Sequence, residues 1–334
     1  SIEGEFDANN PATPSGGALP GGIGWYRKHF RTPNLEGKIM TVEFDGIFMN
    51  STVYVNGSEV GYRPYGYSSL SYDITEWLNP EGEMNVIAVR CDNLEQPNSR
   101  WYAGCGIYRN VRLVTTSDVF VEYSGTYVTT PEVSNSSATV NAVVTITNKG
   151  AHDKAITLVN SIYNEDNRRE RKSESTCIIP SGETIDIEMD MQIPSPRLWD
   201  IDNPHMYELR SVIEVDNRPI DEYVTPFGIR TFEFNADTGF WLNGRNVKLL
   251  GVCMHHGMGS LGTAVHRRAL VRQLEILRSF GVNAIRTSHN PPAPELLDLC
   301  DEMGFLVMDE AFDMWNAEKR GMDYHLWFPD WCKR

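Results

Sequence analysis

Residues 283–310 read NAIRTSHNPPAPELLDLCDEMGFLVMDE, and two kinds of local pattern alternate within them. Asn283–Arg286 is a short run typical of a buried strand. Pro294–Met303 has the apolar spacing of a helix, with proline at its start and Gly304 just past its end. Phe305–Met308 is a second short apolar run. Strands that alternate with helices indicate parallel βα units.

The same alternation begins further upstream. Val247–Val252 has the composition of a buried strand, and Arg267–Phe280 has helical spacing that Gly281 would end. Residues 232–334 thus hold three βα strands, whereas a closed (β/α)8 barrel takes about 250 residues. We therefore expect residues 232–334 to form the N-terminal part of a TIM-barrel catalytic domain, with the remaining strands beyond Arg334.

The preceding part of the chain has the pattern of an all-β protein. From about residue 24 to 231, short runs of alternating polarity are separated by turn residues. One example is Thr52–Val55 followed by Asn56-Gly57, a strong signal for a hairpin. The spacing of these runs predicts two sandwiches, a jelly roll over 1–116 and an immunoglobulin-like sandwich over 117–231.

Composition excludes several classes of protein. The 334 residues carry a net charge of −15, which argues against nucleic acid as a partner. No stretch approaches the ~18 apolar residues of a membrane span. The six cysteines are scattered without a CxxC pair or zinc spacing, so we expect free thiols that do not fix the compartment.

One motif points to a different function. Gly257–Gly262 matches the G-x-G-x-x-G pattern of dinucleotide-binding proteins. That function requires a tight strand-to-helix turn and an acidic residue after the second strand. Here Cys253–His256 intervene and the second strand ends in Arg286. We interpret this stretch as a glycine-rich loop.

Polar side chains follow all three predicted strands. His255 and His256 follow the first, Arg286–Asn290 the second, and Asp309 and Glu310 the third. The C-terminal ends of barrel strands form the active-site face. Trp315, just beyond, offers an aromatic surface suited to the apolar face of a sugar ring. The sequence therefore predicts a site at this rim.

Four segments together resemble one enzyme family. Residues 283–310 are similar to the first signature of glycoside hydrolase family 2, which includes β-galactosidases, β-glucuronidases and β-mannosidases. Gly21–Arg27 and Arg100–Arg109 resemble parts of the family's jelly-roll domain. Ser195–Tyr207 resembles the end of its immunoglobulin-like domain. The resemblance covers essentially the whole chain and is nearest to bacterial β-galactosidases of the Bacteroidetes type.

This resemblance implies retaining cleavage of terminal β-galactosides by two glutamates, an acid/base and a nucleophile. In the family pattern both follow later strands, so both would lie beyond Arg334 and no catalytic residue is expected within this chain. The fragment alone is therefore expected to be inactive. The resemblance, with the predicted rim, implies seven substrate-binding residues: His255, His289, Arg286, Asn290, Glu310, Trp101 and Trp315.

Magnesium and sodium are the cofactors that the resemblance suggests. A magnesium-dependent galactosidase of the family carries Glu and His just after the third strand, where this chain has Asp313–Asn316. The sodium-binding loop of that enzyme has an Asp shortly before its Trp, where this chain has Ser99 and Arg100. The usual ligands are thus unmatched, and the sequence assigns no metal-binding residue.

Two other functions stay open. A β-glucuronidase of the same family would need groups from later loops for the substrate carboxylate. A non-catalytic carbohydrate-binding module would have no use for three βα units. For the favoured function the partner is a β-linked oligosaccharide or galactoside, and a homo-oligomer is also open. The resemblance leaves the compartment open between the bacterial periplasm and cytoplasm.

Overall fold

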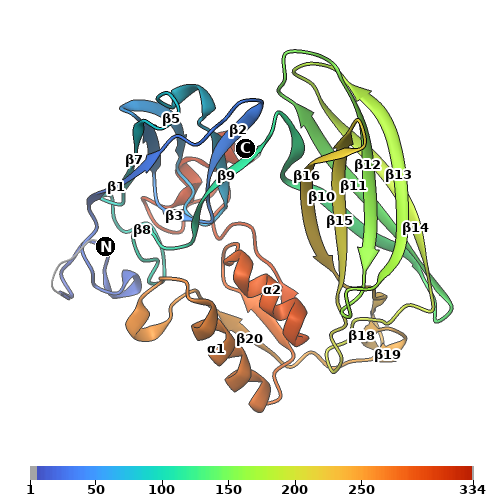
Figure 1. Ribbon diagram of the computed structural model, residues 1–334. Helices are drawn as coiled ribbons and strands as arrows, with labels where there is room; N and C mark the ends of the chain where they lie inside the picture. The colour runs from blue at the N-terminus through green and yellow to red at the C-terminus, as the bar shows by residue number, and fades with distance from the viewer. Residues whose placement is uncertain (1–5, 333–334) are drawn as a thin grey trace.

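The structure is a computed structural model that describes residues 6–332. Within that range the chain is mostly β-strand, with three α-helices and four short 3-10 helices (Figure 1). The prediction of a largely β protein with a short βα portion is confirmed. The chain forms two pairs of antiparallel sheets followed by a smaller part that contains the parallel strands.

The first pair of sheets comes from the N-terminal third. One sheet has the order β1-β7-β4-β5, the other β6-β2-β9, and β3 pairs with β8. The strands are β1 (Ile23–Arg31), β2 (Lys38–Phe44), β3 (Ile47–Phe48), β4 (Ser51–Val55), β5 (Ser58–Arg63), β6 (Leu70–Asp73), β7 (Met84–Asp92), β8 (Gly106–Ile107) and β9 (Val111–Ser117). The 3-10 helices η1 (Pro14–Gly16) and η2 (Thr75–Trp77) lie before β1 and after β6.

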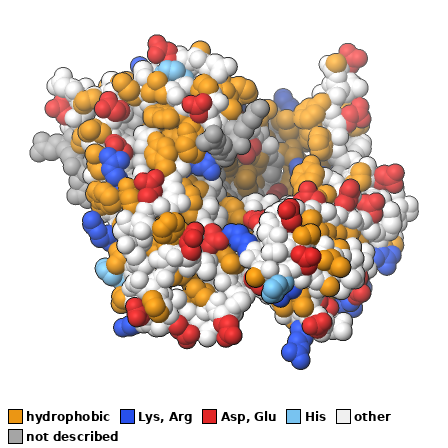
Figure 2. Space-filling view, turned by 90° about the horizontal axis from the view of Figure 1, so that it is seen from above, with side chains coloured by type: hydrophobic (Ala, Val, Ile, Leu, Met, Phe, Trp, Pro, Cys, Tyr) orange, Lys and Arg blue, Asp and Glu red, His pale blue; other side chains and the backbone are white. Residues whose placement is uncertain are grey.

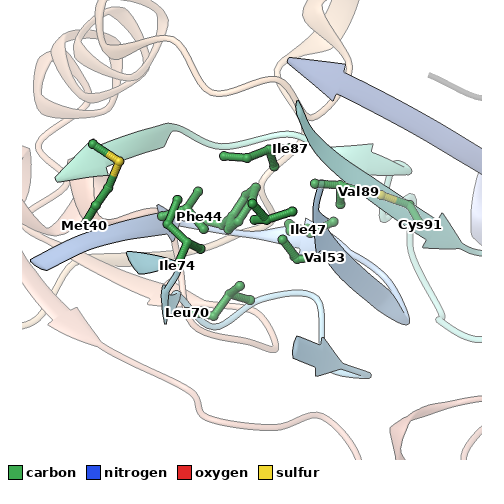
Figure 3. Packing of buried hydrophobic residues seen from close by; sticks show 11 residues of the cluster. Met40, Phe44, Ile47, Val53, Leu70, Ile74, Ile87, Val89 and Cys91 are labelled. Carbon is green, nitrogen blue, oxygen red and sulfur yellow. The ribbon is translucent and has the colours of Figure 1, made fainter. Parts of the chain in front are cut away.

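Alternation along these strands produces the core. In β2 the side chains of Met40, Val42 and Phe44 are buried while their neighbours are more exposed, as a period of two requires. Phe44 and Val53 lie among the buried apolar side chains of this cluster (Figure 3). The β4–β5 hairpin turns at Asn56-Gly57, both with positive φ (50° and 89°), which confirms the predicted hairpin.

The second pair of sheets follows directly. One sheet has the order β10-β11-β14 and the other β13-β12-β15-β16. The strands are β10 (Val119–Val133), β11 (Ser137–Asn148), β12 (Lys154–Tyr163), β13 (Arg169–Ile179), β14 (Thr184–Pro194), β15 (Tyr207–Val215) and β16 (Arg218–Phe227). Fully buried Ile146, Leu158 and Ile213 belong to one of the two clusters between these sheets. The names jelly roll and immunoglobulin-like, and the boundaries at 116/117 and 231/232, stay predictions.

The third part contains the βα units. A small antiparallel sheet, β17-β18-β19, precedes the parallel sheet β20-β21-β22. The elements are β17 (Phe232–Asn235), β18 (Gly239–Leu242), β19 (Arg245–Asn246), β20 (Gly251–Met254), η3 (Gly259–Leu261), α1 (Arg267–Ser279), β21 (Ala284–Thr287), α2 (Pro294–Met303), β22 (Leu306–Met308), η4 (Tyr324–Leu326) and α3 (Phe328–Trp331). Leu270, Leu274 and Ile285 are buried where α1 meets the sheet.

The sequence predicts the bounds of α2 correctly, but the start of the first parallel strand is wrong. Helix α2 spans the predicted residues, and Gly304 ends it in the left-handed conformation at φ 72°. The first strand begins at Gly251, four residues later than predicted. The reason lies in Asn283, whose side chain donates to Lys248 O (3.0 Å) and accepts from Leu250 N (2.8 Å). These bonds replace strand pairing at residues 248–250.

An aromatic cluster attaches the C-terminal segment to the first pair of sheets. Tyr65 OH donates to Ala311 O at 2.7 Å, and its ring centroid lies 4.4 Å from that of Tyr324. The ring of Trp331 lies edge-on to that of Tyr62 on β5, with ring centroids 5.6 Å apart. Figure 1 shows this red segment returning to the blue sheets. Residues 311–331 are thereby held against β5 and the loop that follows it.

The surface shows two further features. On the face in Figure 2, acidic and basic side chains are interspersed with apolar ones. A hollow of about 650 Å³ beside the parallel sheet has a largely apolar lining, in which Phe232, Phe234 and Met308 are more than half exposed.

Over the described range, none of the helices has the length and apolar character that crossing a membrane would require.

Candidate functional site

The three parallel strands deliver polar side chains to one rim, as the sequence predicts. In the ladder Cys253 on β20 lies opposite Arg286 on β21, and Arg286 lies opposite Met308 on β22. The residues that follow these strands therefore meet at a common edge. His289 after β21 and Glu310 after β22 are in direct contact there.

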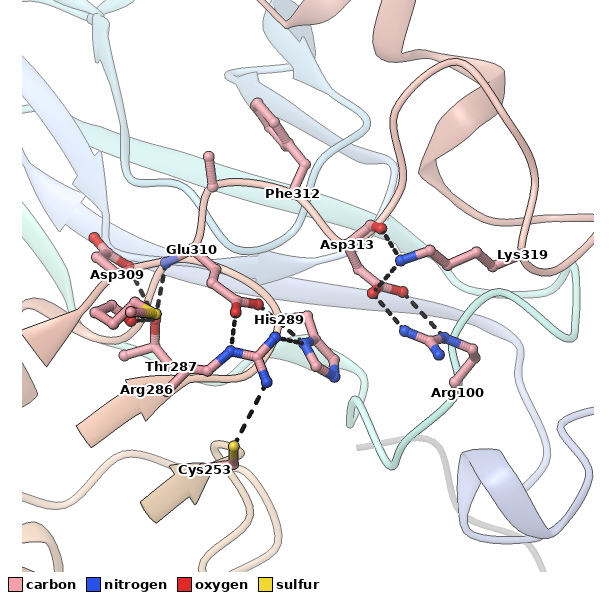
Figure 4. A network of polar contacts seen from close by, with 12 residues as sticks. Arg100, Cys253, Arg286, Thr287, His289, Asp309, Glu310, Phe312, Asp313 and Lys319 are labelled. Atoms are coloured by element: carbon pink, nitrogen blue, oxygen red, sulfur yellow. Dashed lines mark hydrogen bonds and ion pairs between the residues drawn. The ribbon is translucent and has the colours of Figure 1, made fainter. Parts of the chain in front are cut away.

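Arg286, His289 and Glu310 form one connected group (Figure 4). Arg286 Nε donates to Glu310 Oε1, while Glu310 Oε2 lies 2.9 Å from His289 Nδ1. Arg286 Nη2 lies 3.3 Å from the same nitrogen, and Nη1 reaches Cys253 Sγ at 3.5 Å. Glu310 thus holds a guanidinium with one oxygen and an imidazole with the other. A carboxylate engaged in this way is suited to positioning its neighbours.

Thr287 fixes the chain at the end of β22. Its hydroxyl donates to Asp309 Oδ1 at 3.0 Å and accepts from the backbone N–H of Glu310 at 3.1 Å. Thr287 is buried, whereas Asp309 is exposed and Glu310 is partly exposed. The Asp309-Glu310 pair is therefore set by the neighbouring strand, and Glu310 points towards Arg286 and His289.

Trp101 brings the first pair of sheets into the site. Its indole ring stacks on His255 with centroids 5.3 Å apart and meets His289 edge-on at 5.5 Å. Its Nε1–H donates to Tyr67 OH at 3.2 Å. Only 8% of Trp101 is exposed, so its broad face is covered by the imidazole of His255. Trp101 supports the two histidines from behind.

Trp315 lies in the open. It is 61% exposed, donates from Nε1 to Phe312 O at 3.2 Å and packs against Phe328. It lines a hollow of about 520 Å³ together with Arg286, His289 and Glu310. Of the two tryptophans predicted to meet sugar, this is the one whose ring is available to a ligand.

Asn290, a predicted substrate-binding residue, and His256, the neighbour of His255, do not line the hollow. Asn290 is 4% exposed, its Nδ2 donates to Pro291 O, and it lines a separate small cavity behind the rim. His256 lies in the same cavity and its Nε2 contacts Ala103 O at 3.1 Å. Burial lowers the pKa of His256 to about 4, so this imidazole is neutral at physiological pH and joins β20 to the loop before β8.

Burial and charge shift two further groups at the rim. Burial, followed by the nearby His289, lowers the pKa of His255. Hydrogen bonds from Arg286 and Ser288 lower the pKa of the exposed Cys253 thiol. Both shifts favour a neutral imidazole at His255 and a more acidic thiol under the guanidinium.

Arg109 fixes the relation between the first sheets and the βα part. It is buried and donates to three backbone carbonyl oxygens. These are Asp45 O (3.1 Å), Tyr67 O (2.7 Å) and Pro291 O (2.8 Å). The last bond crosses to the segment that follows β21. This side chain therefore helps to hold the segment after β21 against the first pair of sheets.

Sequence reasoning did not assign three further residues at the hollow: Arg100, Asp313 and Lys319. Asp313 pairs with both Arg100 and Lys319. Arg100 and Asp313 are 213 positions apart, so no periodic pattern links them. For Asp313 and Lys319 the available signal was their place in the loop after the third predicted strand, which the barrel rule directs towards the rim. For Arg100 it was the neighbouring Trp101, a predicted substrate-binding residue.

Comparisons with known proteins match two parts of the chain to one family. Residues 119–230 match the family described as Glycosyl hydrolases family 2, and residues 235–323 match Glycosyl hydrolases family 2, TIM barrel domain. A β-galactosidase of Bacteroides ovatus is 50% identical over the whole chain, which spans 39% of that relative's length. A putative β-glucuronidase of Formosa agariphila is 39% identical over 92% of the chain, which covers 29% of that relative.

Solved structures give the same result. A glycosyl hydrolase family 2 member from Bacteroides cellulosilyticus superposes with a TM-score of 0.95 at 39% identity, over 98% of this chain and 42% of that one. A β-glycosidase from Bacteroides vulgatus gives 0.92 at 37% identity, over 100% and 42% of the two chains. Identity of this level along the full length of the chain establishes its family. The chain belongs to glycoside hydrolase family 2.

Proposed function

We propose that these residues form the substrate-binding half of the active site in a retaining β-galactosidase. The observation that carries the proposal is the convergence of Arg286, His289 and Glu310 at one rim, beside the exposed ring of Trp315. The ring of His255 meets that of His289 edge-on, with centroids 5.6 Å apart. Imidazole nitrogens and guanidinium N–H groups suit sugar hydroxyls, which both donate and accept, and a flat indole suits the apolar face of the ring. The extensive identity to a β-galactosidase supports the choice of sugar.

His289 is the residue we expect to contact a hydroxyl of the sugar. Its polar contacts within residues 6–332 both go to Nδ1, from Arg286 and Glu310. Nε2 is then the nitrogen that can meet the ligand. Trp101 limits the tilt of the ring from one side. Asn290, which faces the cavity behind the rim, would act by holding the loop.

The pair of catalytic glutamates is proposed to come from another part of a longer enzyme. Retaining cleavage requires two carboxyl groups about 5–5.5 Å apart, one to protonate the leaving oxygen and one to attack. The carboxylates that line the hollow are Glu310 and Asp313, and both are already paired with cationic or imidazole groups. The apolar hollow beside the parallel sheet fits further barrel strands from the same enzyme.

A β-glucuronidase is the second candidate, and the same charges argue against it. A glucuronide needs a cation that is available to its carboxylate. Arg100 and Lys319 are paired with Asp313, and Arg286 is paired with Glu310. The cations that line the hollow thus already have anionic partners. This favours a neutral sugar such as galactose.

The test uses the complete polypeptide that contains these residues, assayed with nitrophenyl β-galactoside and nitrophenyl β-glucuronide. We expect turnover of the galactoside and a loss of about 100-fold in kcat/KM on His289→Ala. The matched control is His152→Ala, at an exposed turn of the second pair of sheets. Turnover of the glucuronide alone would assign the second candidate. Sugar binding without turnover of either would assign a carbohydrate-binding module.

A further inference from the structure

Asp313 is a buried carboxylate held between two cations. Its side chain is 4% exposed, against 40% for Arg100 and 43% for Lys319. Arg100 Nη2 lies 2.5 Å from Oδ1 and Nε lies 3.2 Å from Oδ2, so the guanidinium meets both oxygens (Figure 4). Lys319 Nζ lies 2.8 Å from Oδ1 and also donates to the backbone carbonyl of Asp313. We refer to these three residues as the Asp313 clamp.

The Asp313 clamp joins the two loops that form one wall of the hollow. Arg100 precedes Trp101, which supports His255 and His289. Asp313 and Lys319 flank Trp315, the exposed aromatic ring. The first loop comes from the first pair of sheets and the second follows β22. Their spacing, and hence the position of both tryptophans, depends on charges carried by the chain itself.

A metal ion does not fit this donor set. Magnesium requires oxygen ligands in near-octahedral geometry, and any cation must approach lone pairs that are not already engaged. Oδ1 of Asp313 accepts from both Arg100 and Lys319 and Oδ2 accepts from Arg100, while each oxygen of Glu310 already contacts Arg286 or His289. Few lone pairs remain for the several oxygen ligands that such an ion needs. An additional cation at Asp313 would also face two positive charges in direct contact with the same carboxylate.

Burial alone would raise the pKa of Asp313, but the hydrogen bonds from Arg100 and Lys319 outweigh it and lower the pKa. Asp313 is therefore ionised throughout the neutral range. A buried carboxylate that stays ionised needs a permanent counter-charge, and here two side chains supply it.

We propose that Arg100 and Lys319 take the place that a bound magnesium or sodium ion would have in this wall, so that the site keeps its shape without either ion. The inference rests on the proposed function for its location, because it concerns the same hollow. Its test measures ion binding and stability, so failure of the inference is distinguishable from failure to hydrolyse a galactoside.

The first measurement uses the chain of 334 residues after treatment with EDTA and transfer into choline chloride. Melting temperature is followed while MgCl2 or NaCl replaces choline chloride at constant ionic strength, and magnesium is titrated calorimetrically. We expect no saturable heat and no shift in melting temperature beyond that in choline chloride. A saturable response to either ion that Asp313→Asn abolishes would overturn the proposal.

The second measurement removes the cations. The double variant Arg100→Gln/Lys319→Gln leaves the buried carboxylate without its partners, and we expect the melting temperature to fall by about 5 °C or more in choline chloride. The matched control is Arg168→Gln/Lys172→Gln, which removes one arginine and one lysine charge from surface ion pairs just before β13 and near its start. If Arg100→Gln/Lys319→Gln had the same melting temperature as this control, the two cations would not stabilise the wall, and the proposal would be wrong.

If the double variant does not fold, Lys319→Gln alone gives the same comparison against Lys172→Gln. This variant keeps the Arg100 guanidinium on both oxygens of Asp313. We expect a smaller fall in melting temperature than for the double variant, and still a larger one than for its control. Equal melting temperatures for Lys319→Gln and Lys172→Gln would contradict the proposal.

Discussion

Glu310 Oε2 lies 2.9 Å from Nδ1 of His289, while the other oxygen of the same carboxylate accepts from Arg286. An ionised carboxylate can only accept, whereas the Arg286 guanidinium, 3.3 Å from the same nitrogen, can only donate. The carboxylate contact is the shorter of the two, so we expect Nδ1 of His289 to carry the proton in the neutral ring. The remaining nitrogen, Nε2, is then an acceptor towards the hollow. The carboxylate thus orients the imidazole and favours one tautomer.

The tautomer can be measured in the unliganded chain. Long-range proton–nitrogen NMR of histidine-labelled protein should show His289 protonated at Nδ1, with assignment by loss of the signal in His289→Ala. In Glu310→Gln the amide oxygen is needed by Arg286, so the NH2 group faces Nδ1 and the proton should move to Nε2. Glu302→Gln, on the exposed side of α2, serves as control. A wild-type ring protonated mainly at Nε2 would contradict this assignment.

The 334 residues alone are expected to leave nitrophenyl β-galactoside unhydrolysed. The carboxylates in the hollow, Glu310 and Asp313, are engaged in ion pairs, whereas retaining cleavage needs an attacking carboxylate and a proton donor. The measurement is nitrophenol release by repurified chain over hours. Turnover that survives repurification and disappears on His289→Ala would show that the chain holds its own catalytic groups.

Arg109→Met should destabilise the chain by about 3 kcal/mol, because three carbonyl oxygens lose their donor at a buried site. Urea unfolding gives the free energy directly. Arg31→Met is the control, since Arg31 is exposed and donates to Gly82 O. Equal losses in the two variants would mean that the bonds of Arg109 add little to the joint.

His256 should make stability depend on pH. Its folded pKa is about 4 against an ordinary 6.5, so between these values the unfolded state binds more protons than the folded one. Stability then rises with pH from 4 to 6.5 and is complete above it, with a contribution of about 3 kcal/mol. His256→Gln should remove that part of the slope in urea unfolding between pH 4.5 and 7.5, whereas exposed His29→Gln should not. If the free energy of unfolding depended on pH in the same way in the wild type and in His256→Gln, the lowered pKa of His256 would be contradicted.

Gly304 separates a backbone effect from a contact effect. At φ 72° any side chain is strained, and a Cβ here would lie 2.4 Å from Ile201 O. Gly82 has a similar φ of 79° but open space around it. We expect Gly82→Ala to cost about 1 kcal/mol and Gly304→Ala about 3 kcal/mol or more in urea unfolding. Similar losses of unfolding free energy in the two variants would show that the backbone at Ile201 moves to make room for the added Cβ.

The sequence was most informative where the cause of structure is local. Pro294 and Gly304 mark both ends of α2, and the turn at Asn56-Gly57 follows from the conformations those residues favour. It failed at residues 247–250 because the bonding partner there is a side chain, that of Asn283, more than 30 positions away. Apolar composition alone could not reveal that competition.

The rim followed from a topological rule, whereas its finer geometry did not. Ends of parallel strands meet at one edge, so the sequence alone predicts that His289, Arg286 and Glu310 lie together. The same rule could not tell that Trp101 lies beneath His255 or that Asn290 turns away from the hollow. Those outcomes depend on how the first pair of sheets packs against the βα part.

The contact between the first pair of sheets and the βα part includes hydrogen bonds from side chains to main-chain oxygens. Arg109 and His256 reach across it from opposite sides, and each meets main-chain oxygen, of Pro291 and of Ala103. A carbonyl is present whatever residue occupies the position. Substitutions can therefore accumulate at 103 and 291 without loss of the bond. Related enzymes could diversify the loops that select a sugar while the docking of the two parts is inherited unchanged.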